Sequence, residues 1–225
     1  MHRITLPTHL VDGTRPCFRF DVVSPRATAL LVIDLQVAFV DEGQPYSSQH
    51  ARDILPNVNG LIAAGRDAGV TIIFTRASTT DTPPYARPTW FDEAVAYGPL
   101  AALLRLGRGE RELSKSLDVR PSDLVIDKYR SSAMLPQSSN IPEFLQQRGI
   151  DTLIIVGALT NYCCENTARD ACQMDYKVFF VTDATAALTD EEHNASLGSV
   201  GGHADLRSTK EMIDLLARFA VGSSG

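Results

Sequence analysis

The sequence of 225 residues lacks the features that mark membrane, secreted and nucleic-acid-binding proteins. It contains no uninterrupted apolar run of about 18 residues, so we expect no membrane-spanning segment. Its first residues lack the apolar core of a secretory signal, and a cytoplasmic location is the resulting expectation. There is no basic stripe, and the formal net charge of -6 argues against nucleic acid as a partner.

Linkers and metal-binding patterns are missing as well. No stretch rich in Pro, Gly and Ser divides the chain, which favours a single domain. The four cysteines, Cys17, Cys163, Cys164 and Cys172, form no CxxC pair, and we expect free thiols. The five histidines are scattered without ligand spacing, and His193 is expected to have a structural role.

Short apolar runs alternate with amphipathic stretches along the chain. The apolar runs predict strands at 29–34, 70–75, 123–128, 152–156 and 177–182. The amphipathic stretches predict helices at 51–68, 140–148, about 162–175, 191–198 and 208–220. Gly69 should close the first helix, and Asn140 and Asp190 are candidate caps. Residues 76–92 predict a loop. This alternation implies an α/β fold, with a mainly parallel sheet covered by helices on both faces.

Three of the predicted strands end in reactive groups. Asp34 and Lys128 close the first and third strands, and the turn from Gly157 to Cys163 follows the fourth. Parallel sheets bind ligands beyond the carboxyl ends of their strands. We therefore expect these three segments to meet at one edge of the sheet.

Each of the three side chains has a catalytic and a structural interpretation. Cys163 lies in the first turn of a helix, where the dipole and unpaired N–H groups favour a thiolate, or it is a buried cysteine that only packs. Asp34 is a general base or a capping or ion-paired aspartate. Lys128 holds Asp34 ionised and favours the thiolate, or it forms a plain ion pair or is a snorkelling surface lysine. Turn geometry alone barely separates Cys163 from its neighbour Cys164.

Three motifs resemble those of the cysteine hydrolases of the isochorismatase-like superfamily. They are Leu31-Val32-Ile33-Asp34-Leu35-Gln36-x-x-Phe39, Asp127-Lys128-x-x-x-Ser132-Ala133 and Gly157-x-x-Thr160-Asn161-x-Cys163-x-Glu165-x-Thr167-Ala168-Arg169-Asp170-Ala171. Their order and spacing agree with the superfamily from about residue 27 to residue 219.

The resemblance implies a three-layer, doubly wound fold with a six-stranded sheet. It also implies a catalytic triad of Asp34, Lys128 and Cys163, with Cys164 as a packing residue. The oxyanion hole would consist of the backbone N–H groups of Cys163 and Leu159, with a cis peptide bond between Ala158 and Leu159. A homo-oligomer, either a dimer or a tetramer, is the expected assembly.

The resemblance also divides the chain into segments. The hydrolase domain would span residues 27–220, with residues 221–225 as a flexible tail. Residues 1–26 would form an arm over a neighbouring subunit or the sheet edge.

Two departures from the superfamily narrow the expected activity. Nicotinamidases carry an Asp-x-His…His metal cluster after the second strand, but residues 75–81 contain no histidine. We therefore expect no catalytic metal, no other cofactor, and a substrate other than nicotinamide. Isochorismatases that hydrolyse a vinyl ether lack the cysteine nucleophile, so Cys163 argues against that activity.

Three hypotheses for the function follow. The first is an amidohydrolase that cleaves a C–N bond of a small amide, carbamoyl or ureido compound through a Cys163 thioester. The others are a vinyl-ether hydrolase and a non-catalytic binding protein that retains the fold. Substrate choice should depend on residues 76–110. The candidate substrate-binding residues are Gln36, Phe39, Arg76, Trp90, Tyr129, Arg130 and Tyr162.

Overall fold

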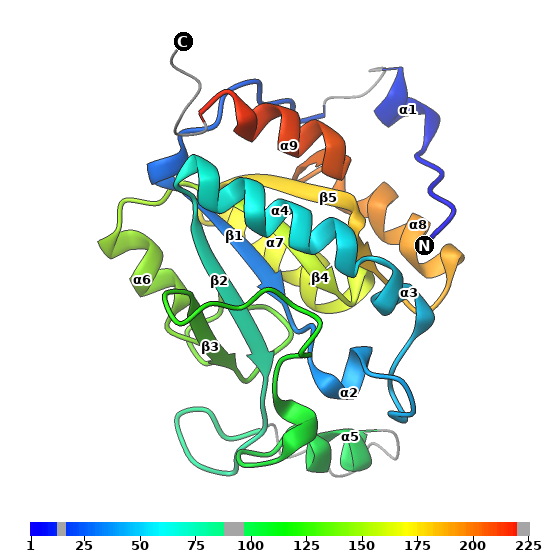
Figure 1. Ribbon diagram of the computed structural model, residues 1–225, viewed down its shortest axis with the longest axis vertical. Coiled ribbons are helices and arrows are strands. Elements are labelled where there is room, and N and C mark those ends of the chain that lie inside the picture. The colour runs from blue at the N-terminus through cyan, green and yellow to red at the C-terminus, as the bar shows by residue number, and fades with distance from the viewer. Residues whose placement is uncertain (13–16, 88–96, 220–225) are drawn as a thin grey trace.

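The structure is a computed structural model that describes residues 1–12, 17–87 and 97–219 (Figure 1). A sheet of six parallel strands, in the order β3-β2-β1-β4-β5-β6, lies at its centre. This confirms the expected parallel α/β fold. The sixth strand has three residues, too few for the apolar pattern to predict, although the resemblance implied it. The strands are β1 (Thr28–Ile33), β2 (Thr71–Ala77), β3 (Leu124–Lys128), β4 (Thr152–Ala158), β5 (Lys177–Ala186) and β6 (Asp205–Arg207).

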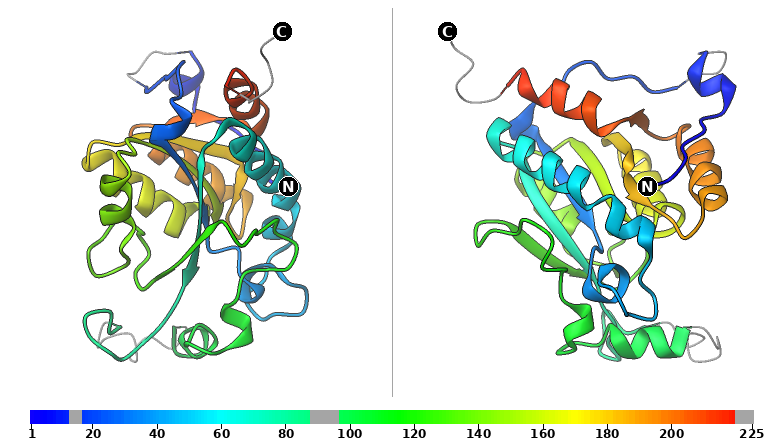
Figure 2. Two further views of the ribbon diagram at one scale, coloured as in Figure 1. Left: turned by 60° about the vertical axis from the view of Figure 1, so that its left-hand side comes forward. Right: turned by 45° about the vertical axis from the view of Figure 1, so that its right-hand side comes forward.

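Helices cover both faces of the sheet and complete the three layers (Figure 2). Helices α4 and α9 pack on one face, and α6, α7 and α8 pack on the other. None of the helices in the described ranges is long and apolar enough to cross a membrane. The described helices are α1 (Thr8–Val11), α2 (Val37–Val40), α3 (Gln49–Asp53), α4 (Leu55–Ala68), α5 (Tyr97–Leu103), α6 (Ile141–Gln147), α7 (Glu165–Gln173), α8 (Asp190–Val200) and α9 (Thr209–Ala217).

Strand β1 shows why the sheet needs a layer on each side. Its side chains alternate between the two faces, and apolar residues occupy both sets of positions. Leu30 and Val32 are buried in the core beneath α4 and α9. Leu31 and Ile33 are buried in the core on the opposite face. A strand that is apolar at successive positions is stable only when both faces are covered.

The helix predicted at residues 51–68 is two helices in the structure. Helix α3 ends at Asp53, and α4 begins at Leu55 with Pro56 in its first turn. Proline has no N–H group to continue a preceding helix, but it fits the first turn of a new one. Gly69 closes α4 as expected, in a left-handed conformation with φ +86°.

Of the two predicted helix caps, Asn140 occupies the expected position without a capping bond, and Asp190 was wrong. The Asn140 side chain makes no capping hydrogen bond at the start of α6. Helix α8 is capped by Thr189 and not by Asp190, because Thr189 and Glu192 form a reciprocal capping box. Asp190 instead accepts hydrogen bonds from the ring of His2 and the backbone N–H of Arg3.

The N-terminal residues lie against the sheet edge and α8 (Figure 1). The Thr5 backbone N–H donates to Asn194 on α8. Further along the arm, the Phe20 backbone N–H donates to Asp205 on the edge strand β6, and its ring packs edge-on against Phe179. The segment around Phe20 therefore contacts the edge strand β6, and the assignment of residues 1–26 as an arm stays a prediction.

Candidate active site

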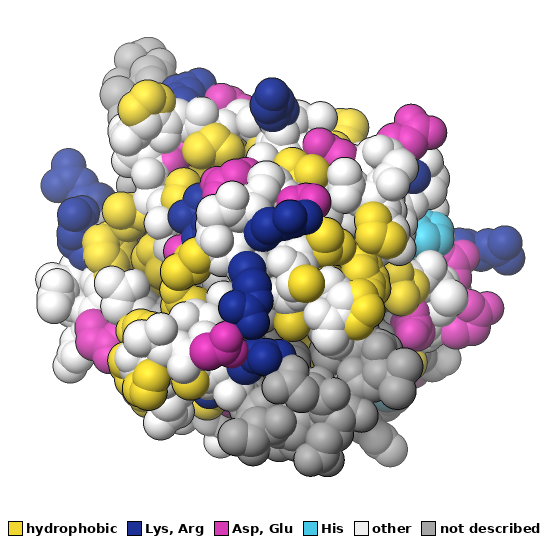
Figure 3. Space-filling model, turned by 90° about the horizontal axis from the view of Figure 1, so that it is seen from below, with side chains coloured by type: hydrophobic (Ala, Val, Ile, Leu, Met, Phe, Trp, Pro, Cys, Tyr) yellow, Lys and Arg dark blue, Asp and Glu magenta, His cyan; other side chains and the backbone are white. Residues whose placement is uncertain are grey.

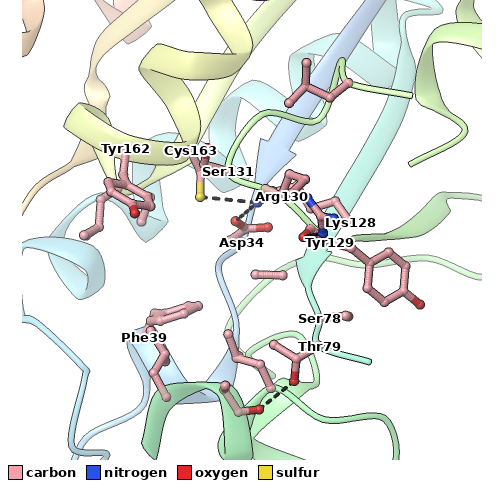
Figure 4. A pocket seen from close by; sticks show the side chains of 17 residues that line it. Asp34, Phe39, Ser78, Thr79, Lys128, Tyr129, Arg130, Ser131, Tyr162 and Cys163 are labelled. Atoms are coloured by element: carbon pink, nitrogen blue, oxygen red, sulfur yellow. Dashed lines mark hydrogen bonds and ion pairs between the residues drawn. The ribbon is translucent and has the colours of Figure 1, made fainter. Parts of the chain in front are cut away.

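A cavity of about 440 Å³ lies at the carboxyl ends of β1, β2, β3 and β4. Asp34, Lys128 and Cys163 meet at one end of it, although they are distant in the sequence (Figure 4). Side chains from α2 and α5 contribute to the rest of its wall. The lining residues are Asp34, Phe39, Ala77, Ser78, Thr79, Leu100, Ala101, Leu104, Lys128, Tyr129, Arg130, Ser131, Leu135, Ala158, Leu159, Tyr162 and Cys163.

Asp34 is held in place by groups on two neighbouring strands. The residue is 1% exposed and takes a left-handed conformation with φ 51°, immediately after β1. Its Oδ1 accepts a hydrogen bond of 2.6 Å from the Thr75 hydroxyl, and its Oδ2 lies 2.7 Å from Lys128 Nζ. A buried carboxylate needs such partners, because burial without them would favour its neutral form.

Lys128 connects the carboxylate with the thiol. Its ammonium group contacts Asp34, the Cys163 Sγ at 3.2 Å and the Arg130 backbone carbonyl at 3.0 Å. An ammonium has three N–H donors, so these three partners satisfy it. Burial disfavours the charged form, but Asp34 and Cys163 together raise the pKa of Lys128 above its usual range.

The turn that carries Cys163 starts with a close approach between two strands. Gly157 has φ +120°, and a Cβ there would overlap the backbone of Ile33 on the paired strand β1. The Ala158–Leu159 peptide bond is cis. Thr160–Cys164 then form one π-helical turn that leads directly into α7. Cys163 faces the cavity, whereas Cys164 is buried in the core between the sheet and its helices.

The thiol differs from the stabilised thiolate that its position at the start of a helix predicts. Burial and the nearby Asp34 carboxylate raise the pKa of Cys163 to about 12, against the opposing effect of the Lys128 ammonium. Desolvation, together with Asp34, therefore outweighs the effect of the lysine on the pKa of Cys163. The raised pKa favours the protonated thiol at neutral pH, so a reaction that used Cys163 as a nucleophile would require a base.

The two residues implied for the oxyanion hole border the same end of the cavity. Leu159 and Cys163 both line it, at the beginning of the helical segment from Thr160 to Gln173. The Leu159 carbonyl accepts the N–H groups of Tyr162 and Cys164, which fixes the turn between them. The role of the two backbone N–H groups stays a prediction.

Four of the seven candidate substrate-binding residues line the cavity: Phe39, Tyr129, Arg130 and Tyr162. Gln36 and Arg76 do not line it. Trp90 lies outside the residues that the structure describes.

Gln36 and Arg76 are occupied by other protein groups. The Gln36 amide accepts the Ala77 N–H and donates to the carbonyls of Ala77 and Arg111. It therefore connects its own segment with the end of β2 and with the backbone at Arg111. Arg76 pairs with Asp127 at 2.8 Å and with Glu112 at 2.6 Å. These partners explain why the structure does not bring either residue into the cavity.

Sequence reasoning missed the apolar wall of the cavity beyond Asp34, Lys128 and Cys163. This wall includes Leu100 and Ala101 of α5 and the adjacent Leu104. The one signal for it was the spacing of leucines at positions 100 and 104, which places them on the same helix face. Thr75, the hydrogen-bond partner of Asp34, was missed because an interior strand threonine carries no distinctive pattern.

The fold brings together three histidines that are scattered in the sequence. The His2 ring stacks between His50 and His193, with centroid distances of 3.8 and 4.2 Å. His193 is buried, and its Nδ1 lies 2.8 Å from the Thr160 hydroxyl in the cysteine turn. Among the described residues, His2, His50 and Asp190 form a group that could hold a metal ion, and none of the three lines the cavity.

Comparisons with known proteins agree with the motifs and the fold. The protein is 35% identical over 178 residues to the Arabidopsis thaliana protein named "Probable inactive nicotinamidase", covering 76% of this chain and 87% of that one. It is 29% identical over 178 residues to the ureidoacrylate amidohydrolase RutB of Caulobacter vibrioides, covering 72% and 78% of the two chains. A cysteine hydrolase from Pseudomonas syringae pv. phaseolicola superposes with a TM-score of 0.82 at 24% identity, over 91% of this chain and 99% of that one.

The isochorismatase domain model matches residues 28–211, which include β1 through β6 and all three residues that meet in the cavity. Members of this family are hydrolases, and amidohydrolases are among them. The match covers most of the chain and follows the order of motifs around Asp34, Lys128 and Cys163. This protein therefore belongs to the isochorismatase family.

Proposed function

We propose that the protein hydrolyses the C–N bond of a small amide, carbamoyl or ureido compound through a thioester on Cys163. One observation carries this proposal: Lys128 Nζ lies 2.7 Å from the Asp34 carboxylate and 3.2 Å from the Cys163 Sγ, beside a cavity of about 440 Å³. A nucleophile, a base and a cation that orients both are the groups that covalent hydrolysis requires.

The first half of the reaction is acyl transfer to sulfur. Asp34 accepts the thiol proton as Sγ of Cys163 attacks the carbonyl carbon, because the raised pKa of the thiol leaves little thiolate beforehand. The Leu159 and Cys163 N–H groups stabilise the negative oxygen of the tetrahedral intermediate. When the C–N bond breaks, Asp34 returns the proton to the leaving amine, which departs neutral.

The second half restores the thiol. Asp34, again ionised, accepts a proton from water as the water oxygen attacks the thioester carbonyl. Collapse of this second intermediate breaks the C–S bond and releases the acid, or a carbamate from a carbamoyl or ureido substrate. The proton on Asp34 returns to the sulfur, so the enzyme begins the next cycle unchanged. Lys128 remains protonated throughout and keeps the carboxylate in position.

The relatives support an amide rather than a vinyl ether. A ureidoacrylate amidohydrolase is among them, and Cys163 provides a nucleophile for acyl transfer. The set of Asp34, Lys128 and Cys163 is complete and in contact, which a binding protein without catalysis would not need. The homo-oligomer implied by the resemblance remains a prediction that light scattering would test.

The test is ammonia release from a panel of primary amides, N-carbamoyl compounds and ureido compounds. Wild type should release ammonia from at least one class, and Cys163→Ala should release none. Cys164→Ala is the matched control, because this neighbouring thiol is buried outside the cavity and its loss should leave turnover measurable. Intact-mass measurement during turnover should show the acyl group on wild type and on Cys164→Ala only. Turnover by Cys163→Ala would disprove the proposal.

A further inference from the structure

We propose that the substrate has an apolar body and a carboxylate, and that Arg130 binds the carboxylate. This inference rests on the proposed function, since it concerns the molecule whose C–N bond Cys163 would attack. Two properties of the described lining together specify such a molecule: the wall is mainly apolar, and one of its cations has no acidic partner among the described residues.

Apolar side chains form most of the wall beyond the triad. They come from four separate segments and include Phe39, Leu100, Leu104, Leu135 and Leu159. The space-filling view of this end of the molecule shows hydrophobic and basic side chains lying next to each other (Figure 3). A cavity of about 440 Å³ with such a wall suits a small molecule that buries hydrocarbon.

Two of the hydroxyl groups in the wall, those of Ser78 and Thr79, are directed to protein partners. The Ser78 hydroxyl donates to the Arg76 carbonyl and accepts from the Arg111 guanidinium. The Thr79 hydroxyl donates to the Ala101 carbonyl at 2.6 Å. Both hydroxyls already donate their hydrogens to protein carbonyls, so neither is free to donate a hydrogen bond to a polar group of the substrate.

Arg130 differs from Arg76 and Arg111, two other arginines near this end of the sheet. Arg76 and Arg111 both pair with Asp127, and both also pair with Glu112. Among the described residues, the guanidinium of Arg130 donates to two neutral carbonyls, those of Tyr129 at 2.7 Å and Ala86 at 2.9 Å. No carboxylate of the described residues pairs with it.

The charge of the lining follows from these contacts. Asp34 and Lys128 neutralise each other, so the described lining carries one net positive charge, on Arg130. This is unusual in a chain with a formal net charge of -6. A guanidinium has five donors, and the two carbonyls leave several of them for a carboxylate.

Arg130 is also close to the reacting groups. Its backbone carbonyl accepts the hydrogen bond from Lys128 Nζ, and its backbone N–H donates to the Ser138 hydroxyl. The main chain at Arg130 is thereby fixed beside the triad, while the side chain lines the same cavity. One small molecule could therefore present its C–N bond to Cys163 and its carboxylate to Arg130.

Calorimetric binding to Cys163→Ala tests the inference without turnover. The probes are the straight-chain carboxylates from butanoate to octanoate, each compared with the primary alcohol of the same length. Each added CH₂ should tighten binding about fourfold until the cavity is filled. Each carboxylate should bind at least about tenfold more tightly than its alcohol, as expected for a charge-assisted contact.

Variants made in the Cys163→Ala background identify the cation. Arg130→Gln should remove the preference for carboxylate over alcohol but keep the chain-length dependence. Arg130→Lys should retain part of the preference. Arg76→Gln, which changes an arginine outside the cavity, should retain all of it. Equal binding of acids and alcohols, no gain with chain length, or a preference that survives Arg130→Gln would each overturn the inference.

Turnover by wild type separates this inference from the proposed function. Hexanamide and the monoamide of adipic acid differ by a terminal carboxylate, and the second should have the higher kcat/KM. Hydrolysis of both with no preference would support the hydrolase and overturn the carboxylate site. A carboxylate preference in binding, with no turnover of any amide, would count against the hydrolase and leave the binding site standing.

Discussion

Replacing Lys128 with methionine should destabilise the protein strongly, because the change leaves the Asp34 carboxylate buried without its cation. Asp34 and Lys128 are each 1% exposed, and their charged atoms are 2.7 Å apart. Methionine fills a similar volume without charge. Asp34 would keep its hydrogen bond from Thr75 but would otherwise have to remain charged without a counterion or take up a proton.

The expected loss is about 3–5 kcal/mol, the range for removing one partner of a buried ion pair. That is a large part of the total stability of an ordinary domain. Changing Asp34→Asn in the same chain removes the unpaired charge, so the double variant should be more stable than the sum of the two single losses predicts. The coupling should be about 2 kcal/mol.

Urea denaturation at neutral pH would measure these losses as shifts of the midpoint at constant slope. Lys210→Met is the matched control, because Lys210 pairs with Asp214 on the exposed surface of α9 and should leave the midpoint almost unchanged. The reasoning would be refuted if Lys128→Met shifted the midpoint no more than this control. Strictly additive losses in the double-variant cycle would refute the proposed coupling.

Three further predictions concern the thiol, a buried histidine and the turn. Asp34→Asn should lower the pKa of Cys163, because the Asp34 carboxylate is one of the groups that raise it. Labelling by iodoacetamide should then begin at a lower pH, and an unchanged pH profile of labelling would contradict the prediction. Burial lowers the pKa of His193 to about 4 from an ordinary 6.5, so the unfolded chain binds the extra proton more readily. The free energy of unfolding should therefore fall by about 3 kcal/mol as the pH decreases from 6.5 to 4. Urea midpoints would measure this fall, which should be smaller in His193→Gln. Gly157→Ala should abolish or severely weaken folding, measured by thermal melting, because the new Cβ would overlap the Ile33 backbone; a melting temperature near wild type would contradict the close approach.

The sequence by itself determined the sheet and the proximity of Asp34, Lys128 and Cys163. A strand that is apolar at successive positions must be buried on both faces, which is typical of a parallel sheet. In a parallel sheet the carboxyl ends of the strands lie at the same edge. Asp34, Lys128 and the Gly157–Cys163 turn follow three of the apolar runs. Their proximity was therefore a consequence of topology, and the distances of 2.7 and 3.2 Å are consistent with it.

Only the tertiary structure decided what the neighbouring polar residues do. Gln36, Arg76 and Arg130 look alike in the sequence as polar groups near strand ends. Gln36 binds backbone groups and Arg76 pairs with two acids, whereas Arg130 lines the cavity and pairs with no carboxylate of the described residues. Their partners come from distant segments, so no local pattern reports them.

The same limit applies to the chemical state of side chains. Helix position predicted a stabilised thiolate at Cys163, but its pKa is raised because the surrounding protein excludes water. The stack of His2, His50 and His193 likewise has no signal in their sequence spacing. Periodicity encodes which face of an element is buried, whereas desolvation and charge pairing depend on everything that packs around a group. The sequence therefore determined where the site is, and the packed structure determined the charge on its groups.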